Sequence, residues 1–289
     1  MTSDQGSKAG AWLRLVRAGT LFSPAADVLA GACLAGDPWS GQVARAALAS
    51  VLVYAAGMIL NDHADRATDA RLRPERPIPR GQIGAFQALA AGLTAMGLGI
   101  LVSPAPTYWA AIAALVLVYD YVAKRWLPLA SLCMGTLRGL NLAAGTVAVA
   151  GLPGLDAPVT GPALAYATYI LAVTLLGALE DEPRVRPRAV LGVQSIAPLV
   201  ALAGLMATPE PMLPSWLGLG FAAVFFARQR RIGLAWDQSA IRGSMLWLLL
   251  GTMAYTGLLC LGSGQPWAAV GIFAAARLAR AVARRIALT

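Results

Sequence analysis

The chain has 289 residues, of which 58% are hydrophobic and only 13% are charged. A soluble globular domain carries about 25% charged residues, so this composition favours a membrane protein with several spans over an Ala-rich soluble helical protein. A net charge of +9 would suggest nucleic acid as the partner of a soluble protein, but the charges here follow a membrane layout and we expect no nucleic-acid partner.

Apolar stretches of about the length of a membrane-spanning helix follow one another along the chain. Pro and Gly lie in most of the gaps, and no alternating β pattern occurs, which predicts an all-α helical bundle rather than a barrel. We expect a single membrane-embedded domain over 1–289 with about nine spans, at 18–36, 42–60, 83–102, 107–121, 128–150, 162–179, 189–207, 213–227 and 243–262. A last stretch, 266–285, ends in four arginines and is either a short further span or an amphipathic helix at the interface.

Positive charge alternates between the two sides of this layout. Fourteen of the 23 Lys and Arg residues gather in the segments 61–81, 122–127, 180–188 and 228–242. None occurs in 37–41, 103–106, 151–161, 208–212 or 263–265, and Arg45 is the one basic residue on that side. Because Lys and Arg stay cytoplasmic, we expect an integral protein of a bacterial cytoplasmic membrane whose N-terminus and long polar loops are cytosolic.

The second predicted span ends in an acidic segment, "NDHADRATD", over 61–69. Asp62, Asp65 and Asp69 are spaced by three and then four residues, which places them on one face of a helix, with Asn61 beside them. Crowded carboxylates are tolerable when a cation lies between them, and they suit Mg²⁺, a hard ion that bridges to phosphate oxygens. Asp62, Asp65 and Asp69 are therefore candidate metal ligands.

Arginines follow this acidic segment at once, in "ARLRPERPIPRG". Arg73 and Arg76 are candidates to neutralise a phosphate through forked hydrogen bonds. Acids and bases together indicate a metal–diphosphate site more readily than either cluster alone. The alternative is a solvated loop whose acids and bases pair with one another.

At this segment the chain resembles the UbiA superfamily of intramembrane prenyltransferases. That family carries N-D-x-x-D-x-x-x-D at the end of its second span and then an R-P-[IL]-P-x-G turn, and this sequence has "NDHADRATD" and "RPIPRG". Arg17 matches the arginine of an R-P-x-N-like element in the first span. The "ADVLAG", "YD" and "RGLN" features resemble the EboC-like branch, and the resemblance covers residues 11 to about 200.

The resemblance implies Mg²⁺-dependent transfer of a prenyl group from a prenyl diphosphate to an aromatic or other small lipophilic acceptor within the bilayer. It extends to "VYDYVAKRW" and "LCMGTLRGLNLAAG" further along the chain. The implied catalytic residues are Asp62, Asp65, Tyr119 and Lys124. The implied substrate-binding residues are Asn61, Arg73, Arg76, Arg125, Arg138 and Asn141.

A second acidic motif is where this sequence departs from the family. In place of two aspartates at helical spacing after the sixth span it has "EDE", with Gly177 and Val185 at the positions four residues before and after Asp181. Glu180 and Asp181 are candidates to hold a second Mg²⁺ between them. The alternative is that a second metal binds weakly or not at all.

Two other classes of protein remain open. One is a carrier or transporter, although no internal inverted repeat is visible and the acids lie at the membrane surface. The other is a UbiA-like protein that binds a prenyl lipid without turning it over. Charged and polar residues within the spans, such as Asp27, Asp120 and Arg138, are either functional or pair helix to helix, for instance Asp27 with Arg138.

Overall fold

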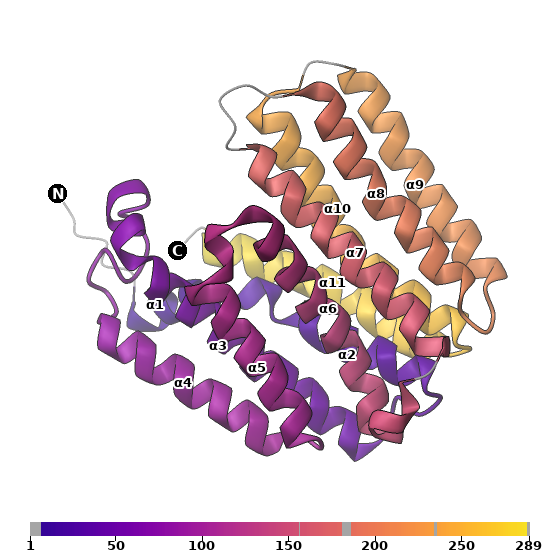
Figure 1. Ribbon diagram of the computed structural model, residues 1–289, viewed down its shortest axis with the longest axis horizontal. Helices are drawn as coiled ribbons and strands as arrows, with labels where there is room; N and C mark the ends of the chain where they lie inside the picture. Colours follow the sequence, from indigo (N-terminus) through magenta and orange to yellow (C-terminus); the bar gives the residue numbers. More distant parts are fainter. Residues whose placement is uncertain (1–6, 156, 181–185, 234–235, 288–289) are drawn as a thin grey trace.

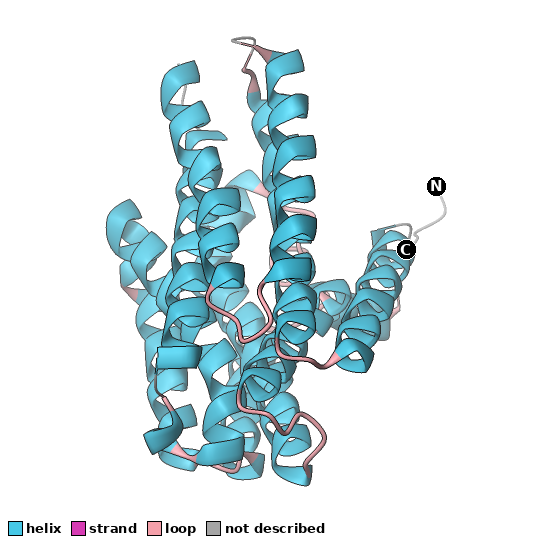
Figure 2. Cartoon of the chain, turned by 90° about the vertical axis from the view of Figure 1, so that its right-hand side faces the viewer, coloured by secondary structure: helices cyan, strands magenta, loops and turns pink. Residues whose placement is uncertain are grey.

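The computed structural model describes residues 7–155, 157–180, 186–233 and 236–287. Within these ranges every regular element is a helix, which confirms the predicted fold class. Helices α3, α4 and α5 lie on one side of the molecule and α7 to α10 on the other, with α2, α6 and α11 between them (Figure 1). Short loops join the helices (Figure 2).

The first predicted span, 18–36, corresponds to a shorter apolar segment, Ala18–Leu34, which is not one continuous α-helix. After α1 (Lys8–Leu15) come a 3-10 turn, η1 (Ala18–Thr20), and a separate helix, α2 (Phe22–Leu34). The break follows from Arg17, whose φ of 51° is left-handed and cannot continue a helix. The 13 residues of α2 span about 20 Å, less than the roughly 30 Å of a bilayer core.

Helix α3 (Gly41–Leu72) is much longer than the predicted second span. The Ser40 side chain caps its start by accepting the Val43 N–H at 3.3 Å. Its first half is apolar, and the helix then continues without interruption through the whole acidic segment 61–69. One rigid element therefore holds the acids in place relative to the bundle.

Helices α4 (Ala85–Val102) and α5 (Pro106–Tyr121) pack against α3. This packing explains the outlying Arg45, which donates to the Val102 carbonyl at 2.9 Å and to the Ser103 carbonyl at 3.1 Å. Arg45 thus donates hydrogen bonds to carbonyl oxygens that have no partner within α4, at the helix end where the helix dipole favours a positive charge. These hydrogen bonds account for the presence of Arg45 on the side of the predicted membrane layout that otherwise lacks Lys and Arg.

Helix α6 (Leu127–Ala150) packs against α2, α5 and α7 (Ala157–Glu180). Its crossing with α2 is unusually close: a Cβ at Gly31 would overlap the Leu142 carbonyl, and a Cβ at Gly145 would overlap the Val28 carbonyl. Small residues at such a crossing let backbones in a membrane approach each other. The crossing places α2 side chains beside the middle of α6.

The remaining helices are α8 (Pro187–Met206), α9 (Met212–Ile232), α10 (Gln238–Gly262) and α11 (Pro266–Ala287). Seven described helices are long and apolar enough to cross a membrane: α3, α4, α5 extended to Arg125, α6, α7, α8 and α10. Helix α9 is not in this set, and it ends in Arg228, Arg230 and Arg231. Helix α11 returns from α10 to contact η1 and α1.

Candidate active site

Four polar side chains lie along α3 near its end. Asn61, Asp62, Asp65 and Asp69 keep the three-and-four spacing within one continuous helix. Asp62 and Asp69 are buried, with 6% and 3% of their surface exposed. Because a buried carboxylate without a partner is costly, the neighbours of this face decide what it can do.

Two arginines approach the buried acids. Arg76 Nη1 lies 3.1 Å from Asp62 Oδ1 and 2.7 Å from Asp69 Oδ2. Arg17 Nη2 lies 3.6 Å from Asp62 Oδ1. Guanidinium groups that can bind phosphate oxygens therefore lie beside carboxylates that can bind a cation.

The "RPIPRG" turn holds Arg76 in this position. Ile78 and Ile83 are buried in a small apolar cluster with α1 and α4 residues, which anchors the turn. Gly81 has a φ of 73°, a left-handed conformation that glycine adopts at no steric cost. The "RPIPRG" turn therefore brings Arg76 back to the acidic face of α3.

Lys124 also contacts the polar face of α3. It belongs to the 3-10 turn η2 (Ala123–Arg125), directly after α5. Its Nζ lies 2.6 Å from Asp65 Oδ1 and donates to Asn61 Oδ1 at 3.2 Å. The end of α3, the turn after it and the turn after α5 thus form a single cluster of acids and bases.

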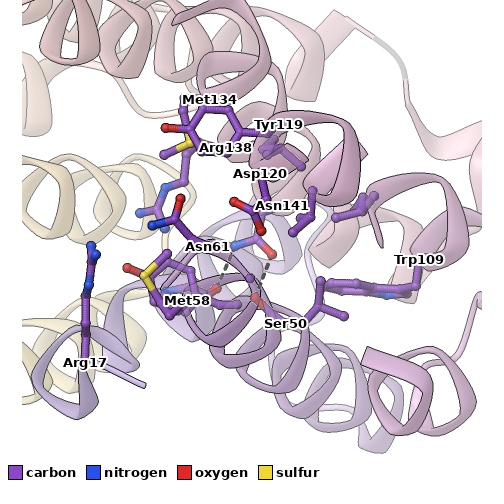
Figure 3. Close-up of a pocket in the computed structure, with 17 residues that line it drawn as sticks. Arg17, Ser50, Met58, Asn61, Trp109, Tyr119, Asp120, Met134, Arg138 and Asn141 are labelled. Carbon is purple, nitrogen blue, oxygen red and sulfur yellow. Dashed lines mark hydrogen bonds between the residues drawn. The ribbon is translucent and has the colours of Figure 1, made fainter. Parts of the chain in front are cut away.

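An apolar pocket of about 160 Å³ opens beside this cluster. It follows α3 from Asn61 to Ser50, about 16 Å along the helix axis, and α5 and α6 supply its other walls. Figure 3 shows Arg17 and Trp109 at opposite ends of the labelled side chains in that view. The lining residues are Arg17, Pro24, Ser50, Val53, Tyr54, Gly57, Met58, Asn61, Trp109, Ile112, Val116, Tyr119, Asp120, Met134, Leu137, Arg138 and Asn141.

Two predicted substrate-binding residues, Arg138 and Asn141, line this pocket and also pair with α2. Arg138 Nη2 lies 3.1 Å from Asp27 Oδ2, and it donates to the hydroxyl groups of Ser23 and Tyr166. Asn141 Nδ2 donates to Asp27 Oδ2 at 2.9 Å. The helix-to-helix pairing of Asp27 with Arg138 is therefore present, and the buried Arg138 Nε has no partner among the described residues.

The second acidic motif is only partly within the described residues. Asp181 lies outside them. Glu180 ends α7, and its Oε1 lies 2.8 Å from Nη2 of Arg242, whose side chain is 63% exposed. The Glu180 side chain itself is only 14% exposed and also accepts from Arg242 Nε at 2.9 Å, so a metal ion at Glu180 would have to displace Arg242.

Most of the predicted site residues converge, but Arg73, Arg125 and Glu180 do not. Asn61, Asp62, Asp65, Asp69, Arg76 and Lys124 form the cluster, and Tyr119 lines the pocket. The side chains of Arg73 and Arg125 are exposed and are not among the pocket-lining residues. Among the described residues, no three His, Cys, Asp or Glu side chains gather closely enough to hold a metal as they stand; Asp62 and Asp69 pair with Arg76, and Asp65 pairs with Lys124.

The structure adds two residues that the sequence did not assign to the site. Arg17 lines the pocket and approaches Asp62. In the sequence, the only indication of this role was the match of Arg17 to the arginine of the R-P-x-N-like element. Asp120 lines the pocket and is 2% exposed. In the sequence, the indication of a functional role was its position as a charged residue inside a predicted span. Spacing along the chain could not join either residue to the acids of α3.

Residues 26–249 match the UbiA prenyltransferase family. The digeranylgeranylglyceryl phosphate synthase of Ignicoccus hospitalis is 38% identical over 120 residues, which cover 40% of this chain and 39% of that protein. The enzyme of the same name from Methanopyrus kandleri is 28% identical over 278 residues, 85% of this chain and 97% of its own length. The chain thus covers only about two fifths of the first of these relatives but nearly all of the second.

Solved structures share the fold at low sequence identity. A UbiA homolog from Archaeoglobus fulgidus bound to GPP and Mg²⁺ superimposes with a TM-score of 0.66 at 16% identity, over 88% of this chain and 98% of the homolog. A UbiA homolog from Aeropyrum pernix K1 gives a TM-score of 0.62 at 19% identity, over 85% and 98%. At these identities the likeness establishes the arrangement of the helices.

Proposed function

Because the chain belongs to the UbiA prenyltransferase family, we propose that it transfers a prenyl group from a prenyl diphosphate to an acceptor in the membrane, with Mg²⁺ as cofactor. The observation that carries the proposal is the position of the acid–base cluster at the end of an apolar pocket. A prenyl diphosphate has the same two halves, a charged head and an apolar tail. The archaeal homolog that binds GPP and Mg²⁺ supports this assignment.

The residues of the cluster fit a metal–diphosphate head. Asp62, Asp65 and Asp69 would hold Mg²⁺, with Glu180 and Asp181 as candidates for a second ion. Mg²⁺ supplies positive charge to the phosphate oxygens while the C–O bond breaks. Arg76 and Lys124 pair with the acids; with Mg²⁺ on the acids, both cations would be available to the phosphate oxygens.

The pocket suits the prenyl tail and the reactive carbon. Val53, Ile112 and Val116 give the tail an apolar wall, which keeps water away from the allylic cation. Tyr119 lines the pocket near the cluster, and its ring face can stabilise positive charge on the allylic carbon. Asn61, which already binds Lys124, would orient the diphosphate end of the donor.

We propose a hydroxyl group of a glycerophosphate-type lipid as the acceptor, in preference to an aromatic ring. The names of the relatives support this choice. Arg17 at the pocket offers positive charge for an acceptor phosphate, and the unpartnered Nε of Arg138, whose charge is paired with Asp27, offers a hydrogen-bond donor. The acceptor oxygen bonds to the prenyl C1, the C1–O bond breaks with its electron pair going to diphosphate, and the hydroxyl proton passes to the departing diphosphate.

We also propose that the cluster faces the cytosol. The ion pair Asp65–Lys124 joins α3 near its end to the turn after α5, and Glu180–Arg242 joins the end of α7 to α10. These pairs link segments that carry most of the positive charge, and such segments remain cytoplasmic. A cytosolic site would receive water-soluble Mg²⁺ directly and the prenyl tail from the bilayer.

The test is turnover by the full chain in lipid nanodiscs. Mg²⁺ and labelled prenyl diphosphates of several lengths are supplied with either a geranylgeranylglyceryl phosphate or an aromatic acceptor, and released diphosphate and lipid products are measured. We expect Mg²⁺-dependent release and prenylation of the glycerophosphate. Absence of release with every donor, even when a membrane extract supplies acceptors, would instead indicate a protein that binds prenyl lipids without turnover.

A substitution inside the pocket should change the preferred donor length. Gly57 lines the pocket one helical turn from Asn61, about 6 Å along α3, and a Cβ there would already lie 3.1 Å from Val116 Cγ1. We expect Gly57→Leu to lower kcat/KM for geranylgeranyl diphosphate relative to dimethylallyl diphosphate by about tenfold or more.

The ratio of the two donors is the measured quantity because a partly unfolded sample lowers both values equally. Gly97→Ala is the matched control, since a Cβ at Gly97 meets nothing within 4 Å. An unchanged donor ratio in Gly57→Leu would show that the tail does not occupy this pocket.

A further inference from the structure

Asp120 is a buried carboxylate without a full set of hydrogen-bond partners among the described residues. It belongs to the last turn of α5, is 2% exposed, and lines the pocket. Its Oδ2 is buried and has no hydrogen-bond partner among the described residues. A buried carboxylate oxygen without a partner costs free energy, and a group that binds there during function would offset that cost.

The surroundings of Asp120 indicate what kind of group that is. Its electrostatic neighbours include Asp62 and Asp65 of the acidic face, together with Lys124 and Arg17. Both of the acids already have partners of their own, Arg76 for Asp62 and Lys124 for Asp65. A third carboxylate within the electrostatic reach of these two acids adds negative charge to the same region, and a divalent cation would offset that charge.

Asp120 could also replace a carboxylate that the second acidic motif lacks. Glu180 pairs with Arg242 and lies at the end of α7, whereas Asp120 comes from α5 and lines the same pocket as Asn61. We propose that Asp120 supplies a further carboxylate to the divalent cation of the diphosphate site, directly or through a metal-bound water, in place of the missing aspartate spacing after α7. This inference rests on the proposed function and deepens it.

A binding experiment tests the inference without turnover. Mn²⁺ serves as the paramagnetic substitute for Mg²⁺, and its affinity for the full chain in nanodiscs is measured by electron paramagnetic resonance with inorganic diphosphate present. We expect Asp120→Asn and Asp120→Ser each to weaken Mn²⁺ binding by about 10- to 100-fold, the effect typical of a group that supports a metal ligand shell. The matched control is Asp37→Asn, an exposed acid in the loop between α2 and α3.

The melting temperature in the absence of metal separates binding from folding. Because Asp120 lacks a partner for Oδ2, neutral variants should melt at the same or a higher temperature than the native chain while losing the stabilisation that Mn²⁺ and diphosphate confer. Unchanged Mn²⁺ affinity in both variants would overturn the inference, as would a weakening matched by a lower metal-free melting temperature. If the native chain binds Mn²⁺ and diphosphate, the proposed function remains supported whatever the Asp120 variants show. If the native chain does not bind them, both the proposed function and the role of Asp120 fail.

Discussion

Asp62→Asn is expected to lower prenyl transfer by about 100- to 1,000-fold, the loss typical of removing one group from a preorganised charged site. Asp62 is the acid at which Arg17 and Arg76 meet, and it is almost fully buried. The substitution keeps the shape of the side chain but removes the negative charge that a divalent cation needs. Rates of diphosphate release at saturating Mg²⁺ give the measurement.

The fold should survive this substitution because Arg76 retains Asp69 at 2.7 Å. The melting temperature should therefore change little, and Glu75→Gln, an exposed acid of the same turn, should leave the rate within about twofold of the native value. A variant Asp62→Asn that turned over at the native rate would show that the acidic face of α3 is not the metal site, and the proposed mechanism would fail with it.

The sequence predicted the parts of the site that depend on local geometry. The spacing of Asp62, Asp65 and Asp69 needs only a continuous helix, and α3 provides one. The turn after α3 likewise follows from its own residues, since Ile78 is buried and Gly81 takes a left-handed conformation. Patterns that lie within one helix or one turn could therefore be interpreted before any packing was known.

Contacts between distant segments could not be predicted in this way. The spacing gave no means of pairing Lys124 with Asp65, or of placing Asp120 beside the acids, because both depend on how α5 packs on α3. Hydropathy also did not predict the division of the first span: apolar residues continue through 18–36, but the segment consists of η1 (Ala18–Thr20) and a separate helix α2 (Phe22–Leu34). Hydropathy measures composition and does not detect such a break.

Gly31→Ala is expected to destabilise the protein by about 3 kcal/mol or more, at the upper end of what overpacking costs. The added Cβ would overlap the carbonyl oxygen of Leu142, and a backbone oxygen on a helix cannot rotate away as the end of a side chain can. Gly145→Ala meets the Val28 carbonyl in the same crossing and should have a similar effect. Thermal unfolding in nanodiscs should show a fall in melting temperature of roughly 10 °C.

The matched control lies in α4, where Gly97→Ala adds the same methyl group in open space and should leave the protein unchanged or slightly more stable. Equal melting temperatures for Gly31→Ala and Gly97→Ala would contradict the close crossing of α2 and α6. The crossing matters for the site because it brings Asp27 to Arg138 and Asn141, two residues that line the pocket. Any Gly31→Ala protein that still folds should therefore also bind donor and acceptor less tightly, since separating the helices displaces this wall of the pocket.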